Sequence, residues 1–338
     1  MATIIRLNFS AYLDPAYPAL EQAKLGKLAP YLAWPSASTT EKAAALADTA
    51  IVLTNSNTSS ALLGEIPQEK IKLLIHPNSG YDNFSPSYVA SAKFPMVLGH
   101  QLRATAVTEF ILACVFQAFT PLPWRTSWDP QRHFPGRNLI AEEHFLLVGF
   151  GHIGSQVAQH LTALGAVIDV FDPWASEKVN QAAALNPRLH PVAWEQIAWP
   201  HVTGLILAAS LNPSSRHLIG PEVVGQLGSR AVLINAARGA LIDPAALSLF
   251  LAGDQHFAYI DTWENEPHPA FDWHHPRLHA SSHVAGVYPT LGDRMLDYLQ
   301  QVITDEQQLA PTSFVQKYQA ELLALRLRHD ESGQAYFI

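Results

Sequence analysis

The sequence holds little cysteine and little charge. Cys114 is the only cysteine among 338 residues, which excludes an intrachain disulfide and fits a reducing compartment. Charged residues make up 15% of the chain, and 21 Lys and Arg stand against 29 Asp and Glu, so the net charge is −8. Because no dense Lys/Arg block occurs, we expect neither nucleic acid nor a membrane as a partner.

Targeting signals and long apolar runs are also missing. The N-terminus has no basic segment followed by an apolar one, so a secretory signal is not expected. Apolar runs such as Phe110–Phe116 fall short of the roughly 20 residues that a membrane helix needs. No Cys/His cluster has the spacing of a metal site, so we expect no metal. These absences together predict a cytoplasmic globular protein.

Apolar residues are abundant, at 48% of the chain, and they come in short runs. The first series of strand-sized runs is Thr3–Leu7, Ala50–Thr54, Lys72–His76 and Met96–Gly99. The second series is Phe145–Gly149, Ala166–Phe171, Gly204–Ala208, Ala231–Ile234, Ala258–Ile260 and Leu278–Ala280. More polar, helix-sized segments lie between the runs, and this alternation predicts an α/β fold with parallel sheets.

The length of the chain exceeds one ordinary domain, so two domains are expected. A long helix is predicted over Thr105–Phe119, between the two series of strands. A later helix is predicted where apolar residues recur at helical spacing, at Leu291, Met295, Leu299 and Val302. If this later helix packs back onto the first domain, the second domain is an insertion within a split outer domain.

The strongest local motif follows a buried strand, in FLLVGFGHIGSQVAQHLTALG. Gly149, Gly151 and Gly154 have the spacing G-x-G-x-x-G, and an apolar stripe at helical spacing comes after them. The first glycine permits a tight turn, the second lets a pyrophosphate approach the backbone, and the third lets the helix pack closely on the strand. The start of the helix, at His152 and Ile153, offers free N–H groups to the phosphates. The motif predicts a dinucleotide site in a Rossmann-type doubly wound domain.

Asp172 ends the next predicted strand. A carboxylate at this point can accept hydrogen bonds from the adenosine ribose hydroxyls and would repel a 2′-phosphate, so NAD is favoured over NADP. The alternative is a glycine turn in a plain βαβ unit, with Asp172 capping a loop.

Polar side chains follow three later strands. Arg238 follows VLINAA, Asp261 follows AYI and His283 follows LHASS. Since ligands of parallel sheets bind beyond the carboxyl ends of the strands, these groups and the nearby Glu266 can converge beside a bound nicotinamide. Alternatively, each residue is structural, with Arg238 paired to Asp243, for example.

The segments around these residues resemble a known family. INAARGALIDPAAL, YIDTWENEP and SSHVAG are similar to the arginine, acidic and histidine signatures of the D-isomer-specific 2-hydroxyacid dehydrogenases. SLNPSSRHLI resembles a further block of that family, with Ser210 and Asn212 in place of the more usual Pro and Thr. NSGYDN resembles its substrate-carboxylate loop. The resemblance covers roughly residues 50–295 and leaves residues 310–338 without a counterpart.

The resemblance implies an NAD-dependent oxidoreductase that interconverts a small 2-oxo acid and a D-2-hydroxy acid. Arg238 would bind the substrate carboxylate and polarise the carbonyl group, tasks that suit a planar, permanently charged fork. His283 would be the general acid/base, because the pKa of imidazole lies near working pH, and Glu266 would orient it. Ala237 and Asp261 would contact the cofactor.

The resemblance also implies the domain roles. Residues 1–102 would form the first part of a smaller, flavodoxin-like parallel α/β domain that binds substrate. Residues 103–286 would form the inserted dinucleotide-binding domain, and residues 287–338 the return helix with a C-terminal tail. The backbone N–H groups of Ser79 and Gly80 would hold the substrate carboxylate. A homodimer built on the dinucleotide-binding domain is expected as well.

Other functions stay open at this point. Arg103 could offer a second positive charge to a phosphorylated or dicarboxylic substrate, as in an erythronate-4-phosphate dehydrogenase, although it could also be a structural arginine at a helix start. An NAD-sensing, corepressor-like protein could keep Arg238, Glu266 and His283 without turnover. A formate dehydrogenase is disfavoured, because that branch carries Gln where this chain has Glu266.

Overall fold

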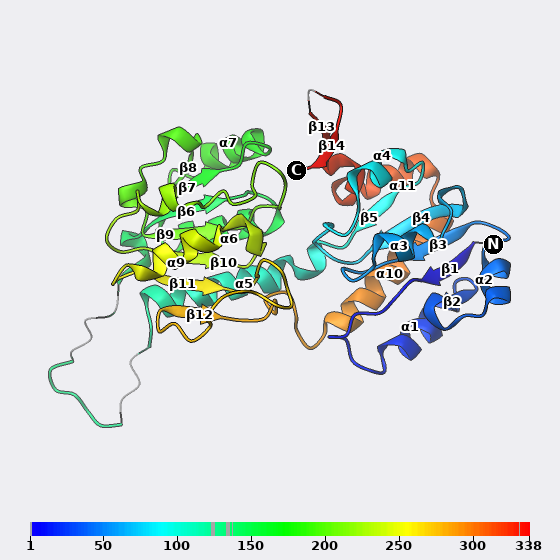
Figure 1. The fold of residues 1–338 in the computed structure, drawn as a ribbon, viewed down its shortest axis with the longest axis horizontal. Coiled ribbons are helices and arrows are strands. Elements are labelled where there is room, and N and C mark those ends of the chain that lie inside the picture. Colours follow the sequence, from blue (N-terminus) through cyan, green and yellow to red (C-terminus); the bar gives the residue numbers. More distant parts are fainter. Residues whose placement is uncertain (1, 123–125, 133–135, 137, 331) are drawn as a thin grey trace. The chain divides into compact units, whose positions relative to one another are not determined.

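The computed structural model describes residues 2–122, 126–132, 136, 138–330 and 332–338. These residues fold into two compact units (Figure 1). Unit 1 comprises Met1–Arg103 and Val287–Ile338, and unit 2 comprises Ala104–Gly286. The sequence of unit 2 is thus inserted into that of unit 1, and each unit has its own sheet and core.

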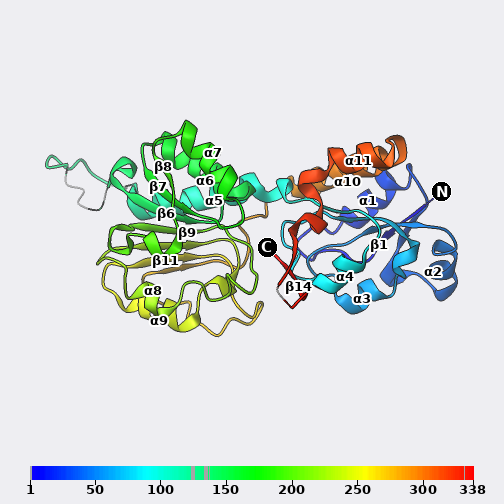
Figure 2. The same ribbon diagram turned by 90° about the horizontal axis from the view of Figure 1, so that it is seen from above.

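Unit 1 is built on a parallel sheet with the flavodoxin-like strand order β2-β1-β3-β4-β5. The strands are β1 (Thr3–Arg6), β2 (Tyr31–Ala33), β3 (Ala50–Leu53), β4 (Ile71–His76) and β5 (Met96–Leu98). Figure 2 shows helices on both faces: α1 (Tyr17–Leu25), α10 (Leu291–Gln308) and α11 (Pro311–Lys317) on one, and α2 (Thr39–Ala45), α3 (Ser60–Gly64) and α4 (Pro86–Ser91) on the other. Because both faces are covered, every residue of β3 is buried, as its continuous apolar run AIVL requires.

Unit 2 contains a larger parallel sheet with the order β12-β11-β10-β9-β6-β7-β8. Its strands are β6 (His144–Val148), β7 (Val167–Phe171), β8 (Leu189–Pro191), β9 (Gly204–Leu207), β10 (Val232–Asn235), β11 (Phe257–Ile260) and β12 (Leu278–Ala280). In Figure 2, α5 (Gln101–Phe119), α6 (His152–Ala163) and α7 (Ser176–Leu185) cover one face, and α8 (Pro221–Val224) and α9 (Pro244–Ala252) cover the other. The order is that of a Rossmann sheet with one added strand, so the predicted fold class is confirmed.

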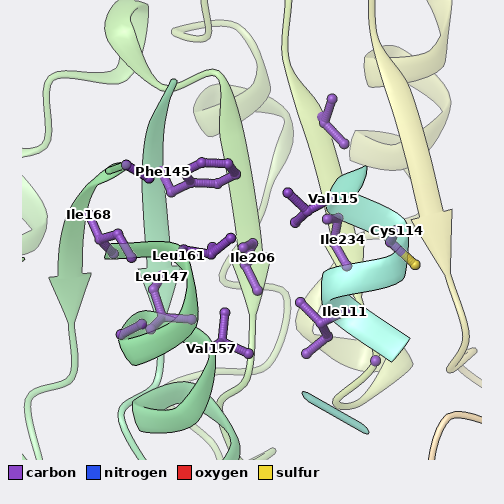
Figure 3. Close-up of a cluster of buried hydrophobic side chains, with 14 of the residues drawn as sticks. Ile111, Cys114, Val115, Phe145, Leu147, Val157, Leu161, Ile168, Ile206 and Ile234 are labelled. Carbon is purple, nitrogen blue, oxygen red and sulfur yellow. The ribbon is translucent and has the colours of Figure 1, made fainter. Parts of the chain in front are cut away.

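The core of unit 2 explains why its apolar runs are strands and its apolar stripes are helices. Figure 3 shows Phe145 and Leu147 of β6 beside Val157 and Leu161 of α6, with Ile111 of α5 in the same cluster. All five side chains are at most 1% exposed. Residues four apart lie on one face of a helix, so Val157 and Leu161 face the strand together and hold the turn between β6 and α6 in place.

The sequence analysis did not predict β2, β8 or the antiparallel hairpin of β13 (Leu327–His329) and β14 (Ala335–Phe337). Each has only three residues. β2 and β8 lie at sheet edges, where half of the backbone hydrogen bonds suffice and a proline is tolerated, so a buried apolar run is not needed.

Helix α5 begins at Gln101, four residues before the predicted start, and ends at Phe119 as predicted. By length and composition α5 could cross a membrane, contrary to the expectation that no segment is long and apolar enough. A core helix passes the same test, and Ile111, Val115 and Phe119 are at most 1% exposed within unit 2.

A buried ion pair connects β1 to α1 in unit 1. The Arg6 guanidinium contacts the Glu21 carboxylate through two hydrogen bonds of 2.7 and 2.5 Å, and the two residues are 2% and 0% exposed. Arg6 also donates to the carbonyl oxygen of Thr54, and Tyr31 donates to Glu21. Burial acts to lower the pKa of Arg6, but the negative charge of Glu21 raises it on balance, so the guanidinium stays ionised.

We predict that Arg6→Met lowers the free energy of unfolding by about 3–5 kcal/mol, because it leaves the buried Glu21 carboxylate without its positively charged partner. Lys24→Met is the matched control, since Lys24 forms a solvent-exposed pair with Asp297 that should contribute about 1 kcal/mol or less. Urea unfolding of both variants measures the difference. Equal losses would mean that the buried pair has no special role.

Candidate active site

The glycine motif joins β6 to α6 in unit 2. Gly149 has φ +98°, and a Cβ there would lie 2.7 Å from backbone atoms of Ala208. A Cβ on Gly154 would lie 2.1 Å from the carbonyl oxygen of Gly149, so the third glycine is needed for close packing of helix and strand. At Gly151, by contrast, a Cβ would meet no atom within 4 Å. Gly151, the middle glycine, therefore leaves the space beside the start of the helix free of side-chain atoms.

This open space lies at the N-terminus of a helix. Gly151 is the N-cap residue of α6 and provides no side-chain cap, and the helix begins at His152 and Ile153. The first backbone N–H groups of a helix and its partial positive charge favour an anion. These residues fit the pyrophosphate of a dinucleotide, in agreement with the sequence motif.

Asp172, at the end of β7, is bound to the glycine turn. Its carboxylate accepts hydrogen bonds from the N–H groups of Phe150 (2.7 Å), Trp174 and Ala175 (both 3.0 Å). Asp172 therefore caps its own loop, which was the structural alternative. A carboxylate oxygen has more than one lone pair, so the expected contact with ribose hydroxyls stays a prediction. Lys178, which the sequence analysis missed, donates to the carbonyl oxygen of Phe150 at 3.1 Å and brings a cation to the same turn.

Gly151 and Gly154 should respond differently to substitution by alanine. Gly154→Ala places a methyl group against the Gly149 carbonyl oxygen and should destabilise unit 2. Gly151→Ala should unfold like the wild type but bind NADH at least about tenfold more weakly, because the methyl group occupies the space expected for the phosphates. Thermal unfolding and NADH fluorescence titration separate the two effects. Unchanged NADH affinity in Gly151→Ala would mean that the dinucleotide does not bind at this turn.

The loop after β10 carries Arg238. Asn235, which is 0% exposed, holds this loop: its amide donates to the carbonyl oxygen of Arg238 at 2.9 Å and accepts from the N–H of Ala237 at 3.1 Å. A Cβ on Gly239 would lie 2.0 Å from the backbone of Trp263, so only glycine lets the arginine loop meet the loop after β11. The two loops are packed backbone to backbone.

Asp261 connects the loop after β11 to the loop that carries His283. The side chain is 0% exposed and accepts hydrogen bonds from Ser281 Oγ (2.6 Å) and from the N–H groups of Val284 (2.8 Å) and Ala285 (3.0 Å). The N–H of His283 donates to the carbonyl oxygen of Asp261 at 2.7 Å. This geometry supports a positioning role for Asp261, while its expected contact with the nicotinamide stays untested.

His283 has a strained backbone and a carboxylate partner. Its φ is +57°, a conformation that costs free energy in a residue with a Cβ and is held here by the Asp261 hydrogen bonds. Nδ1 of His283 lies 2.8 Å from Oε2 of Glu266, and Glu266 Oε1 accepts from the N–H of Trp263 at 2.7 Å. Half of the imidazole is exposed, so Nε2 is the nitrogen left to exchange a proton.

The charge state of Glu266 follows from its neighbours. Burial acts to raise the pKa of this carboxyl, but the hydrogen bonds from His283 and Trp263 and the positive charge of Arg238 outweigh burial and hold the pKa below its usual range. Glu266 is therefore ionised at neutral pH and can only accept a hydrogen bond from Nδ1–H of His283. Arg238 and His283 thus both lie within electrostatic range of Glu266 in unit 2.

Glu264, two residues earlier, faces other partners. It forms an ion pair with Arg216 and lies 3.0 Å from Nε2 of His217, a residue whose φ is +52°. The structure therefore brings Glu266, and not Glu264, to His283. This arrangement agrees with the expected pairing of Glu266 with His283, and Glu264 provides a matched control for mutagenesis.

The loop with Ser79 and Gly80 belongs to unit 1 and follows β4. His76, at 0% exposure, holds it: Nε2 lies 2.7 Å from the carbonyl oxygen of Gly80, and Nδ1 lies 2.9 Å from Thr54 Oγ1. Asn83 donates to the carbonyl oxygens of Asn55 and Thr58. The loop is fixed by side chains that the sequence analysis did not single out.

Arg103, at the end of the first segment of unit 1, has an aromatic partner. Its Nη2 donates to the hydroxyl of Tyr12 at 2.6 Å, and its guanidinium lies 5.1 Å from the centre of the Tyr12 ring. Tyr12 is 42% exposed, so the pair lies at the surface of unit 1. The contact orients the guanidinium without removing its charge.

His76 should make the stability of unit 1 depend on pH. Burial lowers the pKa of His76 from 6.5 to about 4. The unfolded chain therefore takes up a proton between these values and the folded chain does not, so stability is complete above pH 6.5 and falls as the pH drops towards 4. The loss should reach roughly 3 kcal/mol. Urea unfolding at several pH values should show a shallower slope for His76→Gln than for the wild type. Identical slopes would contradict this.

Comparisons with known proteins agree with this arrangement. Residues 122–285 match the family model described as D-isomer specific 2-hydroxyacid dehydrogenase, NAD binding domain. The 4-methyl-2-oxopentanoate reductase A of Aspergillus oryzae is 28% identical over 65% of this chain and 69% of that protein. The erythronate-4-phosphate dehydrogenase of Pseudoalteromonas atlantica is 26% identical over 65% of this chain and 54% of that protein.

A similar solved structure is that of D-lactate dehydrogenase from Aquifex aeolicus complexed with NAD and lactic acid. Its TM-score is 0.71 at 15% identity, over 95% of this chain and 99% of that chain, which shows a common fold. Among the first curated relatives, the match spans only 38% to 69% of their own length.

The residues that the sequence analysis missed share one property. His76, Asn235 and Gly239 act on the backbone of the loops that carry the predicted groups. The sequence can indicate that a residue ends a strand, as His76 and Asn235 do. It cannot indicate the hydrogen bonds of these two side chains, because the bonds depend on which loops meet at the edge of the sheet.

Proposed function

We propose that the chain, whose residues 122–285 match the NAD binding domain of the D-isomer-specific 2-hydroxyacid dehydrogenases, is an NAD-dependent oxidoreductase that interconverts a small 2-oxo acid and the D-2-hydroxy acid. The observation that carries the proposal is the 2.8 Å contact between His283 and Glu266, beside the charge of Arg238. A proton donor and a permanent cation are what the reduction of a charged 2-oxo acid requires.

The turn Gly149–Gly154 would hold the pyrophosphate of NAD and Asp172 would hold its ribose, and the bound cofactor would supply or accept the hydride. In the reducing direction, Nε2 of His283 donates a proton to the 2-oxo oxygen while Nδ1 stays bonded to Glu266. This proton and a hydride added to C2 together convert the 2-oxo group into a hydroxyl, and Glu266 stabilises the positive charge of the imidazole before the proton leaves. In the oxidising direction Nε2 removes the hydroxyl proton.

Arg238 binds the substrate carboxylate and polarises the 2-oxo group in this proposal. The N–H groups of Ser79 and Gly80 bind the same carboxylate, and their loop is prepared for this by the His76 and Asn83 hydrogen bonds. A loop that is already ordered loses little entropy when it binds an anion. A cytoplasmic location and a homodimer stay predictions of the sequence.

A second candidate function has its own observation. Several relatives carry the name erythronate-4-phosphate dehydrogenase, and Arg103 holds a surface guanidinium on the unit that carries Ser79 and Gly80. This arrangement favours a substrate with a distal anion, such as a phosphorylated 2-hydroxy acid. A corepressor-like protein without turnover is the remaining alternative, and detectable turnover would exclude it.

We predict that His283→Ala lowers kcat by about 10²–10⁴-fold with NADH binding unchanged, because only the proton donor is lost. Glu266→Gln should lower kcat by about 10²-fold, because a neutral amide cannot stabilise the imidazole charge. Glu264→Gln is the matched control and should stay within a few-fold of wild type, since Glu264 contacts Arg216 and His217. Steady-state kinetics at 340 nm measures all three. Full activity of His283→Ala, or a greater loss in Glu264→Gln than in Glu266→Gln, would reject the assignment.

The substrate class can be read from a screen at 340 nm. NADH and NADPH are each tested with glyoxylate, pyruvate, hydroxypyruvate, branched 2-oxo acids and phosphorylated or dicarboxylic analogues. If Arg103 reads a distal anion, Arg103→Ala should reduce kcat/KM for the phosphorylated or dicarboxylic substrates about tenfold more than for pyruvate, and Arg103→Lys should retain part of that preference. Equal losses for all substrates would make Arg103 a structural residue.

A further inference from the structure

Residues 319–338 have no counterpart in the family pattern, but those that the structure describes, 319–330 and 332–338, are folded within unit 1. The hairpin of β13 and β14 continues into Ile338, whose N–H donates to the carbonyl oxygen of Arg326 at 2.9 Å. An antiparallel bridge joins Leu322 to Val97 of β5, the last strand of the sheet. The segment is therefore attached to the sheet edge that lies next to the loop after β4.

Tyr81, which follows Gly80 directly, is the contact between this segment and the Ser79–Gly80 loop. The side chain is 7% exposed and turned into the core of unit 1. Its hydroxyl donates to the backbone oxygen of Ile338 at 2.6 Å. Its ring packs edge-to-face against Phe337, with the centroids 5.2 Å apart and an interplanar angle of 73°.

The contact lies in a shared apolar cluster. Phe337 is 8% exposed and Leu323 is 0% exposed, and both belong to the cluster that contains Tyr81, Phe84 and Leu98. A ring contact and a buried hydrogen bond therefore act on the same side chain. Tyr81 cannot rotate unless both are lost.

The loop is thus held at two successive residues from two sides. His76 binds the carbonyl oxygen of Gly80, and the C-terminal segment binds the side chain of Tyr81. These contacts fix the peptide group between Gly80 and Tyr81, and they restrict the peptide groups just before it, because each residue has only two free backbone angles. The Ser79 and Gly80 N–H groups precede this clamp directly, and the backbone and side-chain hydrogen bonds of the described residues include none that these two N–H groups donate.

We propose that residues 319–338 are a positioning element for substrate binding, with Tyr81 and Phe337 as the positioning residues that orient the Ser79 and Gly80 N–H groups. The inference rests on the proposed function, because it takes the substrate carboxylate to be the ligand of this loop. Loss of the clamp raises KM for the 2-oxo acid and leaves NADH binding unchanged, since the dinucleotide motif belongs to unit 2.

The test compares two substitutions that each remove one tyrosine hydroxyl. Tyr81→Phe removes the hydroxyl that binds Ile338. Tyr88, whose side chain packs against the same cluster, has a buried hydroxyl with no hydrogen-bond partner among the described residues, so Tyr88→Phe is the control. Tyr81→Phe should raise KM for the 2-oxo acid about fivefold to tenfold, with kcat and the NADH dissociation constant within twofold of wild type. Tyr88→Phe should leave all three at wild-type values.

Phe337 provides the second pair. Phe337→Ala should raise KM more than Tyr81→Phe does, and Phe337→Leu, which refills most of the volume, should recover part of the loss. Amide hydrogen exchange of residues 77–84 in the full-length variants reports the order of the loop without any substrate. Exchange should be faster than wild type in Tyr81→Phe and in Phe337→Ala, and unchanged in Tyr88→Phe.

The possible outcomes separate two failures. Wild-type KM and wild-type loop exchange in Tyr81→Phe would overturn the inference, as would a lower melting temperature that leaves KM unchanged. If the wild-type chain reduces no 2-oxo acid with either cofactor, the proposed function fails, and the exchange experiment still decides whether the C-terminal segment orders the loop.

Discussion

The buried carboxylate of Asp261 is the interaction on which the candidate active site depends. It lies at the end of β11, is closed off from solvent, and accepts three hydrogen bonds from the segment Ser281–Ala285. A buried charge is stable only when its hydrogen-bonding capacity is used, so the segment cannot move away without a large cost. This constraint holds His283 in a left-handed backbone conformation that an unrestrained histidine rarely adopts. The imidazole is thereby placed against Glu266, which leaves Nε2 for the proposed proton transfer to the substrate.

The same principle recurs at the other strand ends. Asn235 fixes the arginine loop, and His76 fixes the loop of Ser79 and Gly80; both are fully buried at the carboxyl end of a parallel strand. A polar group at that position is enclosed by the sheet below and the loops above, so it is well placed to bind loop backbone. The groups proposed to meet substrate are more exposed. Buried residues thus set the geometry, and exposed ones provide the chemistry.

Much of this could be predicted from sequence, for identifiable reasons. Continuous apolar runs such as that of β3 indicate strands covered on both faces, and the spacing of Gly149, Gly151 and Gly154 indicates the turn and the helix after it. The short strands β2 and β8 and the C-terminal hairpin could not be predicted, because none of them is a continuous buried apolar run. The contacts of His76 and Tyr81 could not be predicted either, because they join residues whose proximity depends on the complete fold. Glu266 was expected beside His283 from the family resemblance, and the course of the loop directs Glu264, two positions earlier, to Arg216 and His217 instead.

The central claim is that His283, held by Asp261 and paired to Glu266, faces the 2-oxo oxygen of a bound substrate together with Arg238. The most direct measurement is a crystal structure of the chain with NADH and oxamate, an unreactive analogue of a 2-oxo acid. The proposal predicts Nε2 of His283 and the Arg238 guanidinium within hydrogen-bond distance of the oxamate oxygens, with the His283–Glu266 contact retained. Oxamate bound away from His283, or an imidazole released from Glu266, would contradict it.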